Sequence, residues 1–543
     1  MMKTIYITLF GLLMSQASFS QFESYSTLAN QAQDKLHNSF RSSSGSYYIE
    51  NNGTSNTYFH YWWNAHALDV LVDAYERTND SKYVTRINTL VNNWSNNNGG
   101  SIYKDYYDDM EWFSLSLFRA WKATGNGTFL NMSTDIWDDI KIGENSNQGG
   151  GIAWRKNQLD YKNVPANAPA IIYACRRHQE WGHSWELDLA TDLYDWLKAT
   201  LRESSGRIND GINRQGNGQI DYWQFTYNHG TFIGAALEMY QSTNNSTYLN
   251  DAIATADYAI QSNDLVTNGI LRNEGTADAG LFKGIMVRYL ALLAQESAVP
   301  SSKRNAYIAF LEDQAESIHI DGFNRNDDLI GVDWTQAPGS STWMSAHLSG
   351  MMMLEIAADL GFTAPEPPVV LYEDCNGGGY AVPLAVGSYS LGDLQALGVT
   401  NDDISSVDVT SGYSLTLYRD YDFSGGSITK TGDDACLVDD GFNDDVSSVV
   451  VSQSGARVAG PVEEMEANQK VTIYPNPVVP GSNLTIGGWK TVRTIDVLNL
   501  NGQLVRKLEL TENTISTNGL SKGVYVMRIT TEKGVDYQKL LVE

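Results

Sequence analysis

The sequence predicts a multidomain protein in which an all-α (α/α)6 barrel is followed by two all-β domains. From about residue 25 to 360, apolar side chains recur at helical spacing, and short polar stretches rich in Asn, Asp, Ser and Gly interrupt them. Longer loops rich in Gly, Asn and aromatic residues precede alternate helices, as expected where one end of a ring of hairpins carries a site. After the proline-rich stretch TAPEPPVV, short alternating segments punctuated by Gly and Asp predict strands.

About twelve helices, paired into six hairpins, are expected in the first domain. The predicted helices span residues 27–40, 61–78, 82–95, 109–124, 128–140, 166–181, 184–201, 229–242, 247–261, 279–296, 302–317 and 343–360. Polar stretches such as RTNDSKY, TGNGTFL and STNNSTYL separate the members of a pair, because their residues favour helix ends and turns. We therefore expect a cleft at the end of the barrel that carries the long loops.

The chain begins with a segment typical of a secretory signal. A lysine, an apolar run too short to span a membrane and small residues precede Gln21. No later run of about 20 apolar residues follows, so no membrane span is expected and the protein should be secreted or lie at the cell surface. The expected domains are a signal peptide at 1–20, the barrel at 21–362, a first β domain at 369–453 and a second at 471–543.

Charge and cysteine content narrow the range of partners. The formal net charge of −27 disfavours binding to nucleic acid or to an anionic membrane, and a neutral or cationic substrate fits better. The three cysteines form no CxxC metal cluster, although Cys375 and Cys436 fall in one later segment and are able to pair after export. The sequence leaves that pairing and the oligomeric state open.

Catalysis by carboxylates is the chemistry that remains after other motifs are eliminated. The chain has no GxxxxGK[ST] phosphate loop, no HExxH zinc helix and no GxSxG nucleophile elbow. Carboxylates in aromatic-lined loops suit glycoside hydrolysis, in which one carboxyl protonates the leaving oxygen while another attacks the anomeric carbon or activates water. No cofactor is expected for such a reaction.

The best candidates are Asp108 and Asp109, which stand side by side in YYDDMEW at the start of a predicted helix. Acidic residues are common in the first turn of any helix, so a simple helix-start role is the alternative. At a loop-to-helix junction, however, both side chains reach one cleft with their carboxyls about 5 Å apart, a separation that favours retention of configuration. One carboxyl of so close a pair has a raised pKa and remains protonated as the acid.

Further residues in the repeated loops are candidates for substrate binding. They are Trp62, Trp63, Trp112, Trp154, Asn163, Asp210, Tyr227 and Asn228. Aromatic planes stack on the apolar face of a sugar, and Asn and Asp bind its hydroxyls. The alternatives are core packing for the tryptophans and helix capping for Asp210 and Asn228.

Five segments resemble, in order, the motifs of glycoside hydrolase family 76, the endo-acting α-1,6-mannanases. They are YYDDMEWFSLSLFRAWKATGN, GGGIAWRKNQLDYKNVPAN, INDGIN, QFTYNHGTFIGAALEMY and LFKGIMVRYLALL. The resemblance covers about residues 25 to 360 and implies an (α/α)6 barrel and a retaining mechanism with Asp108 as nucleophile and Asp109 as general acid/base. Pro165 and Pro169 depart from an expected uninterrupted helical start, and His229 stands where we expect a glutamine. We expect these departures to shift the cleft wall and to alter a sugar contact.

The sequence therefore predicts a secreted, retaining endo-α-1,6-mannanase that acts on mannan polysaccharide or oligosaccharide. Two alternatives are a non-catalytic glycan-binding protein that has kept the barrel, and a transglycosylase of the same family. The intact acidic pair argues against the first alternative. Hydrolysis and transfer share a glycosyl-enzyme intermediate, so the sequence does not separate them, nor does it give the preferred branching or chain length.

The first β domain carries a near-repeat, NDDISS at 401–406 and NDDVSS at 443–448. Hard oxygen ligands of this kind suit Ca²⁺, whereas a pair of Asx turns is the structural alternative. The candidate metal ligands are Asn401, Asp402, Ser405, Asn443, Asp444 and Ser447. The segments LYEDCNGGGYAV and LYRDYDFSGGSIT resemble hairpins of microbial βγ-crystallins, which implies two Greek keys and two calcium sites. Whether this domain stabilises the enzyme or binds glycan is left open.

The last β domain, with YPNP, IDVLNLNGQLV and LSKGVYVMRI, resembles the type IX secretion sorting domain of certain Gram-negative bacteria. The resemblance implies passage across the outer membrane by the type IX secretion machinery and removal of the domain. A small carbohydrate-binding β-sandwich is the alternative, because a strand pattern alone does not distinguish the two.

Overall fold

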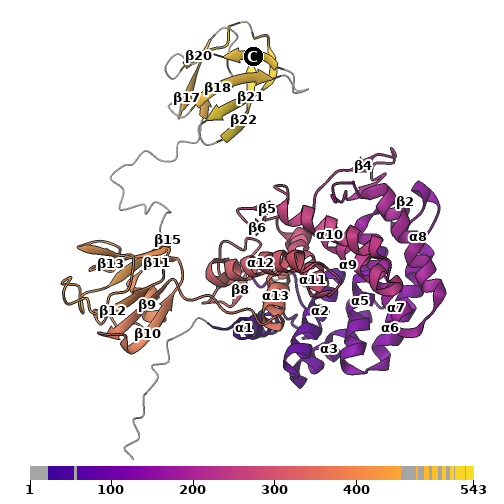
Figure 1. Cartoon of the computed structure of the whole chain (residues 1–543), viewed down its shortest axis with the longest axis horizontal. Coiled ribbons are helices and arrows are strands. Elements are labelled where there is room, and N and C mark those ends of the chain that lie inside the picture. Colours follow the sequence, from indigo (N-terminus) through magenta and orange to yellow (C-terminus); the bar gives the residue numbers. More distant parts are fainter. Residues whose placement is uncertain are drawn as a thin grey trace, which may run out of the picture. The chain divides into compact units, whose positions relative to one another are not determined.

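The computed structural model describes residues 23–53, 58–453 and, with gaps, 472–542 (Figure 1). The expected signal peptide at 1–20 lies outside the described residues. Buried hydrophobic residues form three separate cores, at 25–357, 369–451 and 478–542. The first core is helical and the other two are built from strands, so the predicted fold class of a helical domain followed by two all-β domains is confirmed.

Six inner helices form a closed ring, which identifies the first domain as the predicted (α/α)6 barrel. They are α2 (Tyr61–Thr78), α5 (Tyr107–Thr124), α7 (Ala168–Trp181), α9 (Thr226–Thr243), α11 (Phe282–Gln295) and α13 (Met344–Asp359). Each helix packs on the next in this order, and α13 returns to pack on α2. The first thirteen residues of α9 are buried except Tyr227, as expected for a helix surrounded by protein.

Each of six outer helices packs mainly against one inner helix. They are α1 (Tyr25–Ser39), α3 (Ser81–Asn92), α6 (Gly127–Ile140), α8 (Ser184–Leu201), α10 (Ser246–Gln261) and α12 (Ser301–Ser317). All twelve predicted helices are thus present, with a short extra helix α4 (Trp94–Asn97). Five hairpins are consecutive in sequence, whereas the sixth pairs the first helix, α1, with the last, α13.

The short connections between hairpin partners follow from local side-chain chemistry. Helices α2, α5 and α9 end at Asn79, Gly125 and Asn244, all in the left-handed conformation that Gly and Asn adopt most readily. The residue that follows each one caps the next helix with its side chain: Asp80, Asn126 and Asn245 accept from backbone N–H groups two residues on. One dipeptide therefore stops one helix and starts the next.

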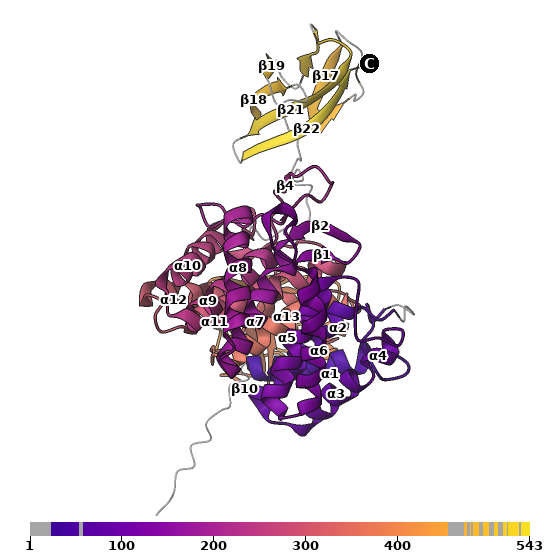
Figure 2. The ribbon, with the colours of Figure 1, turned by 90° about the vertical axis from the view of Figure 1, so that its right-hand side faces the viewer.

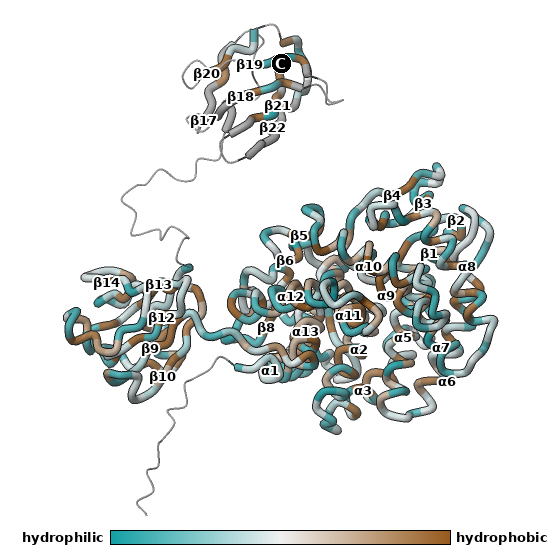
Figure 3. Tube along the Cα trace, in the orientation of Figure 1, coloured by the Kyte–Doolittle hydropathy of each residue, from teal (hydrophilic) through white to brown (hydrophobic). Residues whose placement is uncertain are grey.

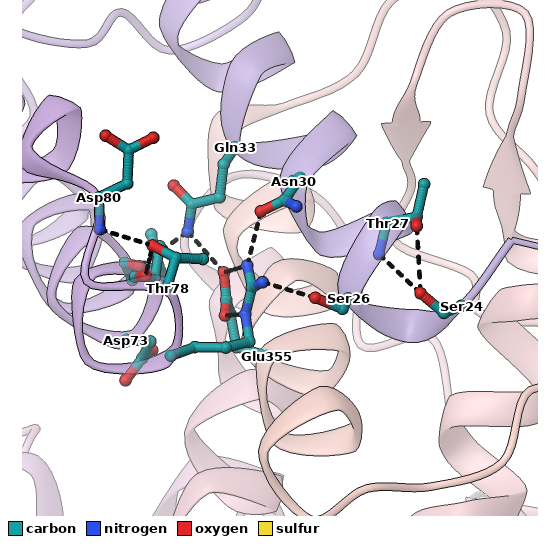
Figure 4. Close-up of polar contacts among 12 residues, drawn as sticks. Ser24, Ser26, Thr27, Asn30, Gln33, Asp73, Thr78, Asp80 and Glu355 are labelled. Atoms are coloured by element: carbon teal, nitrogen blue, oxygen red, sulfur yellow. Dashed lines mark hydrogen bonds and ion pairs between the residues drawn. The ribbon is translucent and has the colours of Figure 1, made fainter.

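A buried ion pair joins the first, second and last helices of the barrel. Arg77 Nε of α2 lies 2.6 Å from Glu355 Oε2 of α13, and both side chains are largely buried. Figure 4 shows Gln33, from α1, beside Glu355, to which its Nε2 donates at 3.0 Å. The Arg77 guanidinium also donates to Ser26 and Asn30 of α1, so these polar contacts hold the ring closed.

The long loops at the other end contain short strands that the sequence did not predict. An antiparallel sheet has the order β1 (Ala153–Arg155), β2 (Gln158–Asn163), β3 (Gly211–Ile212) and β4 (Ile220–Asp221). The strands lie at one end of the barrel (Figure 2). Two hairpins pair β5 (Val266–Thr267) with β6 (Ile270–Leu271), and β7 (Phe323–Asn324) with β8 (Leu329–Ile330).

The second domain consists of two antiparallel sheets with a short helix, α14 (Leu391–Ala396). One sheet has the order β10 (Gly378–Leu384), β9 (Val369–Asp374) and β12 (Ser406–Val409). The other has the order β11 (Gly387–Tyr389), β15 (Ser448–Gln453), β13 (Tyr413–Tyr418) and β14 (Ser427–Lys430). Hydrophobic segments, brown in Figure 3, occur on β9, whose Val369 and Leu371 lie in the core. A disulfide joins Cys375 to Cys436, the pairing that the sequence left open.

The described part of the last domain is also all-β. One antiparallel sheet has the order β16 (Thr472–Tyr474), β17 (Asn483–Gly487) and β20 (Thr514–Ser516). The other has the order β19 (Leu504–Leu508), β18 (Val492–Leu498), β21 (Gly523–Thr531) and β22 (Gly534–Val542). Among the helices of the described residues, none has the length and apolar character that a membrane span requires.

Candidate active site

A cavity of about 380 Å³ opens at the end of the barrel that carries the long loops. It is lined by His60, Trp62, Tyr106, Asp108, Asp109, Trp112, Trp154, Asn163, Pro165, Arg214, Tyr227, Asp278 and Phe282. Many of these residues lie at or just before the first turn of an inner helix. The cavity therefore collects the N-terminal ends of helices α2, α5, α9 and α11.

Another cavity, of about 290 Å³, is lined by Arg119 and Arg288. These guanidinium groups already have carboxylate partners, because Arg119 contacts Asp69 at 2.5 Å and Arg288 contacts Asp73 at 2.6 Å. Removing one member of such a buried pair leaves an uncompensated charge. We therefore regard this cavity as part of the structural core and place the chemistry at the loop end.

Asp108 lies in the first turn of α5, where two N–H groups hold its carboxylate. The backbone N–H of Asp109 donates to Oδ1 at 2.9 Å, and the Trp154 indole donates to Oδ2 at 2.9 Å. Burial raises the pKa of Asp108 to about 7, and the charge of Asp278 raises it as well, while both hydrogen bonds lower it. The hydrogen bonds fix the orientation of the group and favour its ionised form.

Asp109 is the member of the pair whose surroundings favour the protonated form more strongly. Burial raises its pKa well above the ordinary range, and the charges of Asp108 and Asp278 add to the effect, against an opposing contribution from Lys104. Asp108 receives two N–H donors to its side chain, so the negative charge of the pair is better accommodated there. The two N–H donors on Asp108 and the raised pKa of Asp109 favour the negative charge on Asp108 and the proton on Asp109.

Asp278 is a third carboxylate of the cavity, which the sequence analysis missed. It lies in the 3-10 helix η4 (Ala277–Leu281) before α11 and accepts hydrogen bonds from the indoles of Trp62 at 3.0 Å and Trp63 at 2.8 Å. Its charge raises the pKa of Asp108 and of Asp109. Asp278 thus positions two tryptophans and favours a retained proton on the acidic pair.

The structure brings five of the eight predicted binding residues to the cavity surface: Trp62, Trp112, Trp154, Asn163 and Tyr227. The other three, Trp63, Asp210 and Asn228, are buried behind that surface. Asp210 Oδ1 accepts from Asn228 Nδ2 at 2.9 Å, and its Oδ2 accepts from Arg214 at 3.2 Å. These buried residues orient groups that line the cavity.

The two departures from the expected motifs have different outcomes. Pro165 lines the cavity, and Pro169 falls in the first turn of α7, where proline is tolerated because that N–H has no partner within the helix. The expectation that His229 alters a sugar contact was wrong. This side chain is buried. Its Nε2 accepts from the N–H of Ile208 at 3.2 Å, and its Nδ1 lies 2.9 Å from the carbonyl oxygen of Phe225, so it fixes the backbone of the loop before α9.

Four further residues that were not among the predicted site residues line the cavity: His60, Tyr106, Arg214 and Phe282. All four lie in or directly beside a segment that the sequence marks as a motif or a predicted helix. His60 directly precedes the predicted helix at 61–78, Tyr106 opens the segment YYDDMEW, and Phe282 is the second residue of the motif LFKGIMVRYLALL. Arg214 directly follows the motif INDGIN, and its place at the cavity depends on the β3–β4 hairpin.

In the second domain, a serine of each NDD segment donates a hydrogen bond to the other segment. Ser447 Oγ donates to Asn401 Oδ1 at 2.9 Å, and Ser405 Oγ donates to Asp444 Oδ1 at 3.1 Å. Each cluster of oxygen atoms therefore draws residues from both repeats, which the sequence did not indicate. Asp402 and Asp444 both have left-handed backbones, as turn residues often do. Among the described residues, no group of three His, Cys, Asp or Glu side chains is placed to hold a metal ion.

Comparisons with known proteins extend these observations. Residues 472–543 match the secretion system C-terminal sorting domain family. An inactive variant of the alpha-1,6-mannanase GH76A of Salegentibacter sp. HEL1_6, with two neighbouring aspartates changed to alanine and alpha-1,6-mannotetrose bound, is 35% identical to this chain. That match covers 62% of this chain and 100% of the other, with a TM-score of 0.60.

Two more relatives match parts of the chain. The mannan endo-1,6-alpha-mannosidase DFG5 of Saccharomyces cerevisiae is 26% identical over 187 residues, which are 32% of this chain and 39% of that protein. A βγ-crystallin domain from Flavobacterium johnsoniae is 43% identical over 16% of this chain and 97% of the other, with a TM-score of 0.16. Residues 24–367 match the model of glycosyl hydrolase family 76. This match covers most of the chain and the whole helical barrel with its acidic pair, and the chain belongs to glycosyl hydrolase family 76.

Proposed function

We propose that the protein is a secreted, retaining endo-α-1,6-mannanase that hydrolyses mannan backbones. The observation that carries the proposal is the acidic pair at the start of α5, where Asp108 is held by two N–H donors while Asp109 keeps its proton. A related mannanase is inactive when two neighbouring aspartates are replaced, which supports assigning catalysis to this pair.

In the first step, the ionised Asp108 forms a bond to the anomeric carbon while Asp109 donates its proton to the glycosidic oxygen. The bond between the anomeric carbon and that oxygen breaks, and the leaving chain departs as an alcohol. In the second step, Asp109 removes a proton from water, the water oxygen attacks the anomeric carbon, and Asp108 is released as a carboxylate. Two inversions at the same carbon retain the α configuration.

The cavity supports the binding of a neutral sugar chain. Trp62, Trp112, Trp154 and Tyr227 present aromatic surface for stacking on sugar rings, and Asn163 supplies an amide. Behind the cavity surface, Trp63 donates to Asp278, and Asp210, which accepts from Asn228, also accepts from Arg214, so these buried residues hold two lining side chains in place. A transglycosylase would use the same intermediate and differ only in the acceptor. A protein that only binds glycan does not require a pair of carboxyls of which one is ionised and the other protonated.

Linear α-1,6-mannan incubated with the protein should yield short oligosaccharides from internal cleavage, and their new reducing ends should initially be α. Proton NMR of the earliest products, recorded before mutarotation, measures the anomer directly. New reducing ends that form first as β would contradict the Asp108 and Asp109 assignment. Products longer than the substrate would identify transfer, and intact mannan with measurable binding would identify a glycan-binding protein.

The second domain is proposed to bind two Ca²⁺ ions through Asn401, Asp402, Ser405, Asn443, Asp444 and Ser447. Clustered carboxylate, amide and hydroxyl oxygens suit this cation, which accepts flexible oxygen coordination. The alternative is a pair of Asx turns, which the same hydrogen bonds would also stabilise.

Calcium titrated into the chelator-treated protein should bind at about two ions per chain and raise the melting temperature, because a ligand that binds only the folded state shifts the equilibrium toward it. Isothermal titration calorimetry and thermal melting measure the two effects. The double variant Asp402→Ala and Asp444→Ala should lose both calcium binding and the rise in melting temperature. The variant Asp439→Ala, which changes an exposed residue, should retain both effects. An unchanged melting temperature and no binding heat in the wild type would leave the turn interpretation.

Export is proposed to begin with a signal peptide at 1–20 and to end with recognition of residues 471–543 by the type IX secretion machinery. The sorting-domain match supports the second step. The proposed mature protein would then retain the barrel at 21–362 and the βγ-crystallin-like domain at 369–453.

A further inference from the structure

Two large aromatic side chains remain exposed beside the cavity. Tyr222 is 62% exposed and Trp223 is 50% exposed. Both directly follow β4, the edge strand of the sheet at the loop end of the barrel (Figure 2). Adjacent exposed aromatic residues are a feature of binding surfaces, because soluble proteins rarely leave contiguous apolar surface in water without a use for it.

The backbone that carries these two rings is held in place. Arg207 donates to the carbonyl oxygen of Tyr222 at 3.0 Å, and Gln224 donates to the carbonyl oxygen of Trp223 at 3.2 Å. Arg272 in turn donates to the carbonyl oxygen of Gln224 at 2.8 Å. The rings are therefore exposed on a fixed segment, which reduces the entropy lost when a ligand binds.

Packed planar groups connect Trp223 with the catalytic pair. The guanidinium carbon of Arg214, a residue of the cavity lining, lies 4.3 Å from the centroid of the Trp223 ring and 5.2 Å from that of Tyr161. The Tyr161 ring contacts the Trp154 ring edge-on at 5.5 Å, and the Trp154 indole donates to Asp108. A continuous series of contacting side chains therefore links Trp223 to Asp108, and two of its members, Arg214 and Trp154, line the cavity.

From these contacts we infer that Trp223 and Tyr222 form a distal subsite, which binds a mannosyl residue of a long α-1,6-mannan chain beyond the residues next to Asp108. Arg214 occupies one side of the indole, so the remaining exposed surface is available to stack on a sugar. Its charge is balanced by Asp210 and Asp221, which makes the rim suited to a neutral chain. The inference rests on the proposed function and adds a preference for long substrates.

The test compares Trp223→Ala, Trp223→Phe and wild type on linear α-1,6-mannooligosaccharides of increasing length. The kcat/KM of Trp223→Ala should fall by about three- to tenfold once the oligosaccharide is long enough to reach the rim, and the deficit should be small on the shortest oligosaccharide that is cleaved. Trp223→Phe, which keeps an aromatic plane, should restore most of the loss. Trp185→Ala removes a similarly exposed tryptophan, 44% exposed at the start of α8, and should match wild type at every length.

Binding of the longest oligosaccharide to Asp108→Asn, with and without Trp223→Ala, provides a second measurement by calorimetry. The double variant Asp108→Asn with Trp223→Ala should bind the oligosaccharide about three- to tenfold more weakly than Asp108→Asn alone. Equal kcat/KM and equal binding with and without the indole would overturn the subsite, as would a loss of the same size at all lengths. A wild-type protein that binds the oligosaccharide without cleaving it would instead overturn the proposed function.

Discussion

Replacement of Asp108 or Asp109 by Asn should each lower the turnover of linear α-1,6-mannan by about a thousandfold, while the barrel melts at an almost unchanged temperature. Asp108→Asn removes the attacking oxygen, and Asp109→Asn removes the proton that the leaving oxygen needs. Asn preserves the shape of both side chains, so the packing at the start of α5 should persist. Initial rates from reducing-end release and thermal melting curves measure the two expectations.

The two variants should differ on a substrate whose leaving group needs no proton, such as an α-1,6-mannooligosaccharyl fluoride. Asp109→Asn should recover much of its first-step rate there, whereas Asp108→Asn should remain inactive. In the wild type, activity on mannan should fall as the pH rises above the pKa of Asp109, because the acid must be protonated. Asp109→Asn should lose that dependence. Equal recovery of both variants on the fluoride would contradict the division of roles.

Glu111→Gln offers a matched control on the same helix. Burial and the charge of Asp108 raise the pKa of Glu111 well above its ordinary value, which favours the protonated, uncharged carboxyl. Gln is a neutral side chain of nearly the same shape, and this variant should keep most of the wild-type activity. A loss as large as that of Asp109→Asn would mean that the whole first turn of α5 responds to any substitution.

The helices were predictable from the sequence because each one carries its own signals. Apolar spacing marks the buried faces, and dipeptides such as Asn79–Asp80 stop one helix and cap the next. The closure of the ring was harder to predict from the sequence. The pairing of α1 with α13 brings together Gln33, Arg77 and Glu355, which are far apart in sequence and meet only in the folded barrel.

The candidate site was predictable where its residues adjoin a motif and not where they depend on three-dimensional contacts. Asp108, Trp112 and Trp154 lie in quoted segments and reach the cavity. Asp278 stands in a polar stretch and becomes recognisable only when the indoles of Trp62 and Trp63 are seen to converge on it. The oxygen clusters of the second domain were incomplete for the same reason, since Ser405 and Ser447 each contact the opposite repeat.

Replacement of Arg77 by Ala should lower the free energy of unfolding of the barrel by about 3–5 kcal/mol, the usual effect of removing one partner of a buried ion pair. The Arg77 and Glu355 side chains are only 9% and 4% exposed, and Arg77 also holds Ser26 and Asn30 of α1. Denaturant unfolding followed by tryptophan fluorescence reports mainly on this domain, because every tryptophan except Trp489 precedes residue 344. A matched exposed pair, Lys122 with Glu180 at 2.7 Å, should contribute less than about 1 kcal/mol, measured with Lys122→Ala.

The loss of unfolding free energy caused by Arg77→Ala should also depend on pH. Burial raises the pKa of Glu355 even in the wild type, and Arg77 opposes that shift. Without Arg77 the folded-state pKa of Glu355 rises further above its unfolded value, so stability is preserved at low pH and lost as the pH rises through the folded-state pKa. The variant should therefore lie closer to wild type at about pH 5 than at about pH 8. A deficit that is constant across this range would show that lost packing of the long Arg77 side chain, and not the unpaired charge of Glu355, destabilises the ring.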